Sequence, residues 1–414
     1  MPTGKPEKET KRKAYQSVLI HRGYKYELKP NNRQKTLLAK FVGCARFAYN
    51  WGLEQRITLL QTQKGRERFT NAIRQYHELV QLKRTEFTWL NEVSKWVPQE
   101  ALRDLEKAFK NYWRGKKNGK NVGFPKFKRK GYHDSFRLYA TIRVYRKTVQ
   151  LPRLGQIRLK ETPQIKGRIL FATVSRKADR WFVSFNVEQV RSETLSVTGP
   201  TIGVDLGIVL ATLSNGIVFE NPRALSRRLR KLRRLSKQFS RKRRGSQNRQ
   251  KAVIRLARLH WHISNIRKDS LHKVTSYLAK NHSQTVIEDL RVYEMLKNKP
   301  LSFFLADVSL SEFRRQLEYK TKWYGTELIV APHFFPSSKR CSRCGNIKKT
   351  LLLSERLYNC EFCGLTLDRD LNAANNLVAA SWAETVNACQ EVGGYRSDGS
   401  VPTDETGTKH HQPS

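Results

Sequence analysis

The sequence predicts an α+β protein of several domains, in which a β-barrel carries an inserted helical domain and is followed by a mixed α/β domain. Three observations support this prediction. Apolar residues recur at three- and four-residue spacing over 34–63, short segments alternate apolar and polar residues over 135–190, and strand and helix signals mix after residue 198. The 414 residues are enough for two or three domains.

The first half of the chain contains the helical domain and the barrel strands. Residues 1–14 are polar and basic, so we expect a disordered arm there. A strand is predicted over 15–28, and helices over 34–63, 70–86 and 98–115, which together make residues 31–116 a helical domain. Five more strands are predicted over 135–144, 147–151, 156–160, 167–176 and 180–190. If the first strand joins them, the barrel spans 15–30 and 117–197, and the helical domain is an insertion.

The pattern changes again near residue 198. A short apolar strand ends at Asp205, and a hairpin with an Asn-Gly turn follows over 209–219. Strand signals return at 285–288 and 327–330, on either side of a helix predicted over 309–324. We therefore expect an α/β domain over 198–338 and 367–388, with a basic helical arm over 223–280. Residues 389–414 have almost nothing to bury, and we expect them to be disordered.

The charge balance indicates a polyanionic partner. Lys and Arg number 80 against 35 Asp and Glu, a formal net charge of +45. Nucleic acid is the expected partner, and an anionic membrane surface is the alternative. The sequence has no apolar run of about 18 residues, the length that a transmembrane helix needs. The polar N-terminus does not resemble a secretory signal, so we expect a cytoplasmic, nucleoid-associated protein.

Two basic segments are candidates for contact with nucleic acid. Residues 223–258 include sixteen Lys or Arg and no acidic residue, and their leucines recur at helical spacing on both sides of Gly245. This predicts a helical hairpin whose cationic face contacts phosphates. In the loop 119–131, aromatic residues alternate with cations, as in single-strand binding, although aromatic anchors that pack the loop onto the barrel are equally consistent. The predicted contacts are Phe124, Lys126, Phe127, Lys128, Arg129, Arg227, Arg228, Arg230, Arg234, Arg241, Lys242, Arg243 and Arg244.

Four cysteines form the most specific motif in the chain. Cys341, Cys344, Cys360 and Cys363 follow the spacing C-x2-C, fifteen residues, C-x2-C. Four thiolates at this spacing favour tetrahedral coordination of Zn2+. All four positions are cysteines, which leaves no open coordination position for a catalytic water. The sequence therefore predicts a structural zinc ribbon over 339–366.

Three acidic residues lie at the ends of predicted elements. Asp205 ends an apolar strand, Glu288 ends a second strand, and Asp370 opens a helix. Carboxylates at such positions can converge around one sheet and hold two Mg2+ ions for phosphodiester cleavage. Each also has a structural alternative: a turn residue, a surface charge and a helix cap, respectively. Asp289 and Asp368 are rivals. Strand alternation points Glu288 and Asp289 to opposite faces, so at most one of them belongs to the cluster, and Asp368 could cap the helix or assist metal binding from one side.

Taken together, these motifs resemble the TnpB family, RNA-guided nucleases that insertion sequences encode and that are related to type V CRISPR effectors. The resemblance covers roughly 15–395 and rests on ordered motifs at 43–50, 122–127, 203–208, 267–273, 287–290, 313–320, 335–339 and 368–374, together with the four cysteines. It implies a RuvC-like, RNase H-type nuclease domain in which Asp205, Glu288 and Asp370 are the catalytic residues that hold Mg2+. It also implies that the barrel is a wedge domain and the helical part a recognition domain.

The resemblance further implies the partners and the reaction. They are a guide RNA from the transposon end and a double-stranded DNA target beside a short adjacent motif, and we expect the protein to be a monomer. The expected activity is RNA-guided, Mg2+-dependent DNA cleavage. A cleavage-deficient regulator of transposition that binds RNA and DNA is one alternative, although the three acidic positions match the family pattern. A miniature CRISPR effector with the same chemistry is the other.

Overall fold

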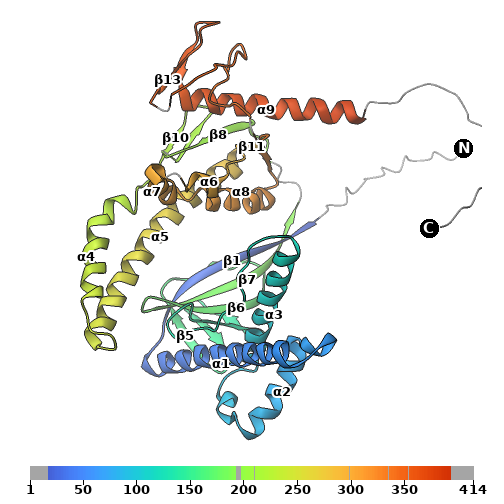
Figure 1. Cartoon of the computed structure of the whole chain (residues 1–414), viewed down its shortest axis with the longest axis vertical. Coiled ribbons are helices and arrows are strands. Elements are labelled where there is room, and N and C mark those ends of the chain that lie inside the picture. The colour runs from blue at the N-terminus through green and yellow to red at the C-terminus, as the bar shows by residue number, and fades with distance from the viewer. Residues whose placement is uncertain are drawn as a thin grey trace, which may run out of the picture. The chain divides into compact units, whose positions relative to one another are not determined.

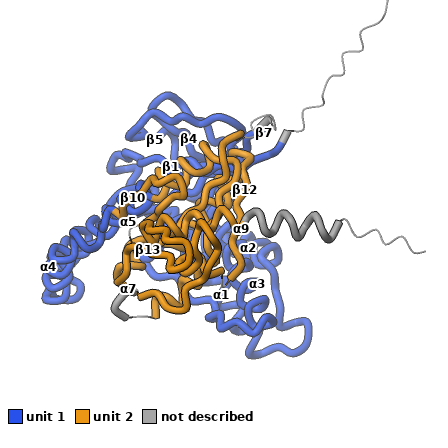
Figure 2. Tube along the Cα trace, turned by 90° about the horizontal axis from the view of Figure 1, so that it is seen from above, with its two compact units in different colours: residues 1–196, 222–270 blue, residues 197–221, 271–414 orange. Residues whose placement is uncertain are grey.

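The computed structural model describes residues 17–192, 197–208, 210–297, 299–333, 335–352 and 354–392. The chain divides into two compact units, residues 1–196 with 222–270, and residues 197–221 with 271–414 (Figure 2). The arm predicted over 1–14 lies outside the described residues. The tail predicted over 389–414 starts too early, because residues 389–392 continue a helix, and the rest of it lies outside the described residues. None of the described helices is long and apolar enough to cross a membrane.

An antiparallel sheet, with seven strands among the described residues, is the framework of the first unit (Figure 1). Its central strand β1 (Ser17–Lys29) pairs with β7 (Arg180–Ser192) on one side and β5 (Gly155–Leu159) on the other. The first strand therefore joins strands that follow the helical insertion, as the sequence predicted. The other strands are β2 (Ser135–Leu138), β3 (Arg143–Val144), β4 (Thr148–Leu151) and β6 (Arg168–Lys177), in the order β2-β6-β7-β1-β5-β4-β3.

The predicted barrel does not close. The end strands of the sheet, β2 and β3, are not paired with each other in the described part of the chain. The strand predicted over 135–144 is interrupted at Ala140 and Thr141, whose φ angles of 55° and 44° are incompatible with a strand. After this break, β2 pairs with β6 and β3 with β4, at opposite ends of the sheet. The sheet is consequently open, while the mixed α/β content agrees with the prediction.

Three helices share a hydrophobic core with this sheet: α1 (Asn32–Thr62), α2 (Ala72–Thr85) and α3 (Trp96–Lys117). A capping box starts α1, because Asn31 and Gln34 each accept a hydrogen bond from the other's backbone N–H. Phe41 of α1 packs against Phe136 of the sheet, with ring centroids 5.1 Å apart. Short 3-10 turns connect the helices at Gly65–Arg68 and Thr88–Glu92.

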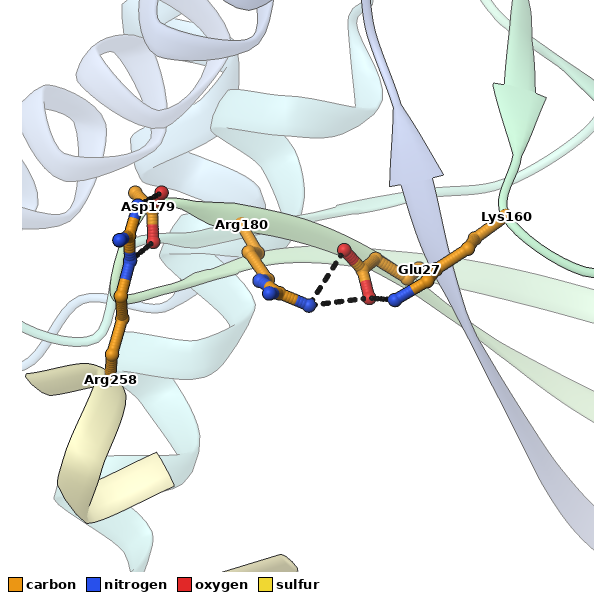
Figure 3. Close-up of polar contacts among 5 residues, drawn as sticks. All are labelled: Glu27, Lys160, Asp179, Arg180 and Arg258. Atoms are coloured by element: carbon orange, nitrogen blue, oxygen red, sulfur yellow. Dashed lines mark hydrogen bonds and ion pairs between the residues drawn. The ribbon is translucent and has the colours of Figure 1, made fainter. Parts of the chain in front are cut away.

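The basic arm is a helical hairpin, as predicted. A 3-10 turn (Ser226–Arg228) leads into α4 (Leu229–Ser240), and α5 (Gln247–Asn281) returns. Leu232 and Leu235 of α4 pack against Leu259 and Ile263 of α5. At the root, Arg258 donates two hydrogen bonds to Asp179, in the turn between β6 and β7 (Figure 3). The next residue of the sheet, Arg180, pairs with Glu27 of β1 at 3.2 Å (Figure 3). Ion pairs thus tie the arm to the sheet within the first unit.

A second sheet, with strand order β10-β9-β8-β11-β12, forms the centre of the second unit. Its strands are β8 (Ile202–Leu206), β9 (Leu210–Leu213), β10 (Val218–Glu220), β11 (Gln284–Ile287) and β12 (Glu327–Val330). Strand β11 is parallel to both β8 and β12. Helices α6 (Val292–Met295), α7 (Lys299–Val308) and α8 (Leu310–Tyr324) cover one face, and α9 (Arg369–Val392) covers the other (Figure 1).

Alternate residues of the short strands β8 and β11 pack on opposite faces of the second sheet. Val204 and Ile287 face the cluster that includes Phe313 of α8, whereas Val286 packs on the α9 side. Gly203 also faces α9, and a Cβ there would lie 2.0 Å from the carbonyl oxygen of Ala374. The absence of a side chain at this position therefore lets the helix backbone rest directly on β8.

Candidate active site

The structure brings Asp205, Glu288 and Asp370 to one edge of the second sheet. Val204 of β8 pairs in parallel with Ile287 of β11, so Asp205 and Glu288 follow at adjacent positions of neighbouring strands. Asp205 shares its face with Gly203, toward α9, and Asp370 lies in the first turn of that helix. The charge of Asp205 interacts with those of Glu288 and Asp370. The three acidic residues singled out in the sequence therefore lie close enough for their charges to interact, and together they are the carboxylate cluster.

The electrostatics of this cluster suit a cation site. Burial, together with the nearby carboxylates of Glu288 and Asp370, raises the pKa of Asp205 to about 8, although Arg369 opposes this shift. Burial also raises the pKa of Glu288, and a hydrogen bond from Ser337 partly opposes it. Carboxylates buried together disfavour their own negative charge, and bound cations would remove that cost. Hard carboxylate oxygens are the donors that Mg2+ prefers, so this donor set fits the ion.

The two rival carboxylates have structural partners. Asp289 accepts a hydrogen bond from Arg314 of α8 at 2.7 Å, and this bond lowers its pKa. Asp368 caps α9, because its Oδ1 accepts hydrogen bonds from the backbone N–H of Asp370 at 2.9 Å and of Leu371 at 3.0 Å. Asp370 is therefore not the helix cap. Its carboxylate lies 3.6 Å from Arg369 Nε, and its charge also acts on Asp205.

The four cysteines form a compact sulfur site. Their Sγ atoms all lie within 4.8 Å of one another, with closest separations of 3.5 Å and 3.6 Å. Four sulfurs placed tetrahedrally at ~2.3 Å from one Zn2+ are about 3.8 Å apart, so the geometry fits zinc. A short hairpin of β13 (Leu357–Asn359) and β14 (Thr366–Asp368) supports the site, with Tyr358 fully buried behind it.

The two cysteine knuckles are built alike. In each, the glycine after the second cysteine donates its N–H to the carbonyl oxygen of the first cysteine, Gly345 to Cys341 and Gly364 to Cys360, both at 3.0 Å. These glycines have φ angles of 76° and 70°, a region that favours glycine. The repeated turn aims both cysteines of a knuckle at a common centre.

Buried asparagines of α9 connect the ribbon to the carboxylate cluster. Asn372 donates to the carbonyl oxygen of Arg340 at 2.7 Å and accepts from the N–H of Ser342 at 3.0 Å, which brackets Cys341. Asn376, one turn later, donates to the same Arg340 carbonyl oxygen at 2.6 Å. The position of the zinc-ligand candidate Cys341 is thereby linked to the position of α9 through the backbone groups on either side of that cysteine.

The same helix supports Glu288 indirectly. Asn376 donates to the carbonyl oxygen of Ser337 at 2.8 Å, and the Ser337 hydroxyl donates to Glu288. Sequence reasoning did not assign roles to Asn372, Asn376 or Ser337. The available signal was two amides four residues apart on the buried side of a helix that is otherwise rich in alanine.

The predicted nucleic-acid contacts divide into packed and exposed residues. Phe124 packs edge-on against Phe109 and Tyr112, at 5.4 Å and 5.2 Å, and Lys128 lies over the ring of Tyr49 at 4.1 Å. Both therefore make contacts that hold the loop in place, although Phe124 is also 37% exposed. Of the remaining residues, only Arg228 is half-buried; the exposed ones are Lys126, Phe127, Arg129, Arg227, Arg230, Arg234, Arg241, Lys242, Arg243 and Arg244. All of these predicted contact residues belong to the first unit, whereas the three carboxylates belong to the second.

Three family models match the chain. One described as "Probable transposase" (OrfB_IS605) matches residues 184–299, a "Cas12f1-like, TNB domain" matches 311–377, and a helix-turn-helix domain of OrfB_IS605 matches 20–65. Together they cover the basic arm, the strand with Asp205, and the ribbon with Asp370.

Relatives match over nearly the whole chain. The chain is 34% identical to the "Putative RNA-guided DNA endonuclease InsQ" of Escherichia coli K12, over 89% of this chain and 94% of the relative. It is 36% identical to a "Putative RNA-guided DNA endonuclease" of Streptomyces pristinaespiralis, over 89% of this chain and 91% of the relative. Among solved structures, CasPhi-2 (Cas12j) bound to crRNA aligns with a TM-score of 0.45 and 11% identity, over 87% of this chain and 98% of that chain.

Proposed function

This chain belongs to the TnpB family, and we propose that it is a transposon-encoded, RNA-guided DNA endonuclease. Similarity to relatives of that description, over most of both chains, supports the class of activity. One observation carries the assignment of the catalytic site: Asp205, Glu288 and Asp370 converge at the edge of one sheet although they lie far apart in the sequence.

In this proposal the three carboxylates are the catalytic residues of a RuvC-like nuclease domain. Asp205 and Glu288 hold Mg2+ from the sheet, Asp370 holds it from α9, and Ser337 orients Glu288. Bound Mg2+ would stabilise charge on the phosphodiester and activate the attacking water. The zinc ribbon keeps a structural role, because its four sulfurs leave no open position for a water.

The remaining parts of the chain would hold the nucleic acids. The helical segment 31–116 serves as the recognition domain and the open sheet as the wedge domain. The exposed cations of α4 and of the loop 119–131 contact phosphates of the guide RNA and the target DNA. Binding that neutralises several phosphates weakens steeply as salt rises, because each contact releases a counterion.

Plasmid cleavage by the co-purified ribonucleoprotein tests the proposal. Wild type should cut a plasmid that carries the guide-matched target, in the presence of Mg2+, and Asp370→Ala should bind the same plasmid without cutting it. Cleavage by Asp370→Ala at the wild-type rate would show that the assigned site is wrong. Binding by wild type without Mg2+-dependent cleavage would favour a regulator. Sequencing the co-purified RNA identifies the guide.

A further inference from the structure

A cavity of about 450 Å3 lies at the carboxyl ends of β8 and β11 in the second unit, on the face of the sheet that α8 covers. Leu206 and Ile287, at the carboxyl ends of the parallel strands β8 and β11, contribute to its wall, and α6 and α8 complete it. Glu288 also lines the cavity, so the cavity and the carboxylate cluster share a residue. Crevices outside the carboxyl ends of parallel strands are common ligand sites, and this volume is in the usual range for them.

The lining combines an apolar interior with polar groups. Leu206, Ile287, Leu290, Val292 and Leu310 supply the apolar part. Tyr293 of α6 also lines the cavity and is 77% exposed. Lys297 lies over one face of its ring, 5.0 Å from the centroid, which leaves the other face for stacking. An exposed aromatic ring beside an apolar wall is a surface on which a flat ring can stack.

The arginines of the lining are each paired with a carboxylate. Arg314 contacts Asp289 at 2.7 Å, Arg315 contacts Glu312 at 2.7 Å, and Arg291 contacts Glu294 at 3.5 Å. A lining balanced in this way is poorly suited to a group that is itself strongly anionic. It suits a neutral planar group with apolar faces and polar edges, which the arginine and glutamate side chains can hydrogen-bond.

We infer that this cavity receives an unpaired nucleobase of the DNA strand being cut, at a position next to the scissile phosphate. The inference rests on the proposed function, because it places the scissile phosphate at Asp205 and Glu288. A strand held there passes the end of β11, where Glu288 leads directly into the cavity. The base stacks on Tyr293, and a single strand turns a base out at the lowest cost, since a paired base must first be unpaired and unstacked.

A fluorescent base reports occupancy of the cavity directly. Single-stranded DNA carrying 2-aminopurine at each successive position is bound to the wild-type ribonucleoprotein with Ca2+ in place of Mg2+. Stacking should quench the fluorescence at one or two adjacent positions. Tyr293→Ala should abolish this quenching and weaken binding of the strand about tenfold, and Tyr293→Phe, which keeps the ring, should preserve both.

A second variant blocks the cavity instead of removing the ring. Ser311 lines the cavity, is exposed, and lies in the first turn of α8, so Ser311→Trp fills the space without burying a larger side chain in the core. It should also abolish the quenching. Quenching at no position, or quenching that both Tyr293→Ala and Ser311→Trp leave unchanged, would overturn the inference. Failure of the proposed function has a separate signature: wild type leaves the matched plasmid uncut with Mg2+, whatever the fluorescence shows.

Discussion

The second unit contains two clusters of candidate metal ligands that are built in opposite ways. The sulfur cluster takes its four ligands from a single segment, Cys341 to Cys363, and two identical turns aim them at one centre. The carboxylate cluster takes Asp205 from one strand, Glu288 from the end of another, and Asp370 from a helix. The first is specified locally, and the second exists only when the sheet and α9 are packed together.

This difference determines how each cluster should respond to a substitution. A local cluster fails when a ligand is lost and is indifferent to packing elsewhere. A cluster assembled from distant elements also fails when a residue that positions those elements changes. We expect the carboxylate cluster to depend on the sulfur cluster but not the reverse, because Asn372 and Asn376 attach the ribbon backbone to the helix that carries Asp370. The following predictions test this asymmetry.

Loss of a cysteine should have the largest effect. Cys360→Ser removes one of four zinc ligands, and zinc binding contributes ~10–16 kcal/mol to folding of such segments. Zinc content, measured by elemental analysis, should fall from about one ion per chain to a small fraction. Cleavage should fall with it, because Asn372 of α9 would lose its hydrogen bonds to the ribbon backbone at Arg340 and Ser342. Asp370 lies on the same helix and would then be less firmly positioned. The matched control is Cys44→Ala, a buried thiol of the first unit, which should keep its full zinc content.

Loss of a carboxylate should separate the two clusters. Asp205→Asn keeps the size of the side chain and removes its charge, and we expect single-turnover cleavage to fall about a thousandfold, since metal stabilisation is worth several kcal/mol. Zinc content should not change. Asp289→Asn is the control, because that carboxylate pairs with Arg314 instead. If Asp289→Asn lost as much activity as Asp205→Asn, the assignment of Glu288 rather than the adjacent Asp289 to the site would be wrong.

Removal of a supporting hydroxyl should have an intermediate effect. Ser337→Ala deletes the donor to Glu288, and loss of such outer hydrogen bonds typically costs 10- to 100-fold in metal affinity or activity. Titration with Mn2+, followed by electron paramagnetic resonance, measures the affinity without cleavage. The adjacent Ser338→Ala should bind Mn2+ like wild type. Equal affinities in the two variants would show that Glu288 needs no support from Ser337.

The elements that the sequence predicted best are those that depend on local patterns. Helices α1 and α8 and strands β8 and β11 begin and end within about two residues of their predicted positions, because periodicity and turn residues determine them. Closure of the first sheet was predicted incorrectly, since it depends on two backbone angles, at Ala140 and Thr141, that no alternation pattern records. The roles of Asn372, Asn376 and Ser337 were invisible for a similar reason: their partners are backbone groups from another segment.

A substitution that touches no metal ligand distinguishes the two clusters most sharply, although its effect should be the smallest. In Gly203→Ala the added Cβ would lie 2.0 Å from the carbonyl oxygen of Ala374, so α9 must shift away from β8. We expect a loss of ~1–3 kcal/mol in stability and a weaker Mn2+ affinity, because Asp370 moves with the helix.

Zinc content should remain at the wild-type level in Gly203→Ala, because the sulfur ligands do not depend on that contact. Gly23→Ala is the matched strand control: a Cβ at Gly23 meets nothing within 4 Å, so stability and Mn2+ affinity should both be nearly unchanged. Weak Mn2+ binding with full zinc would confirm that the carboxylate cluster depends on long-range packing. Parallel loss of both metals would instead mean that the ribbon and the sheet fold as a single unit.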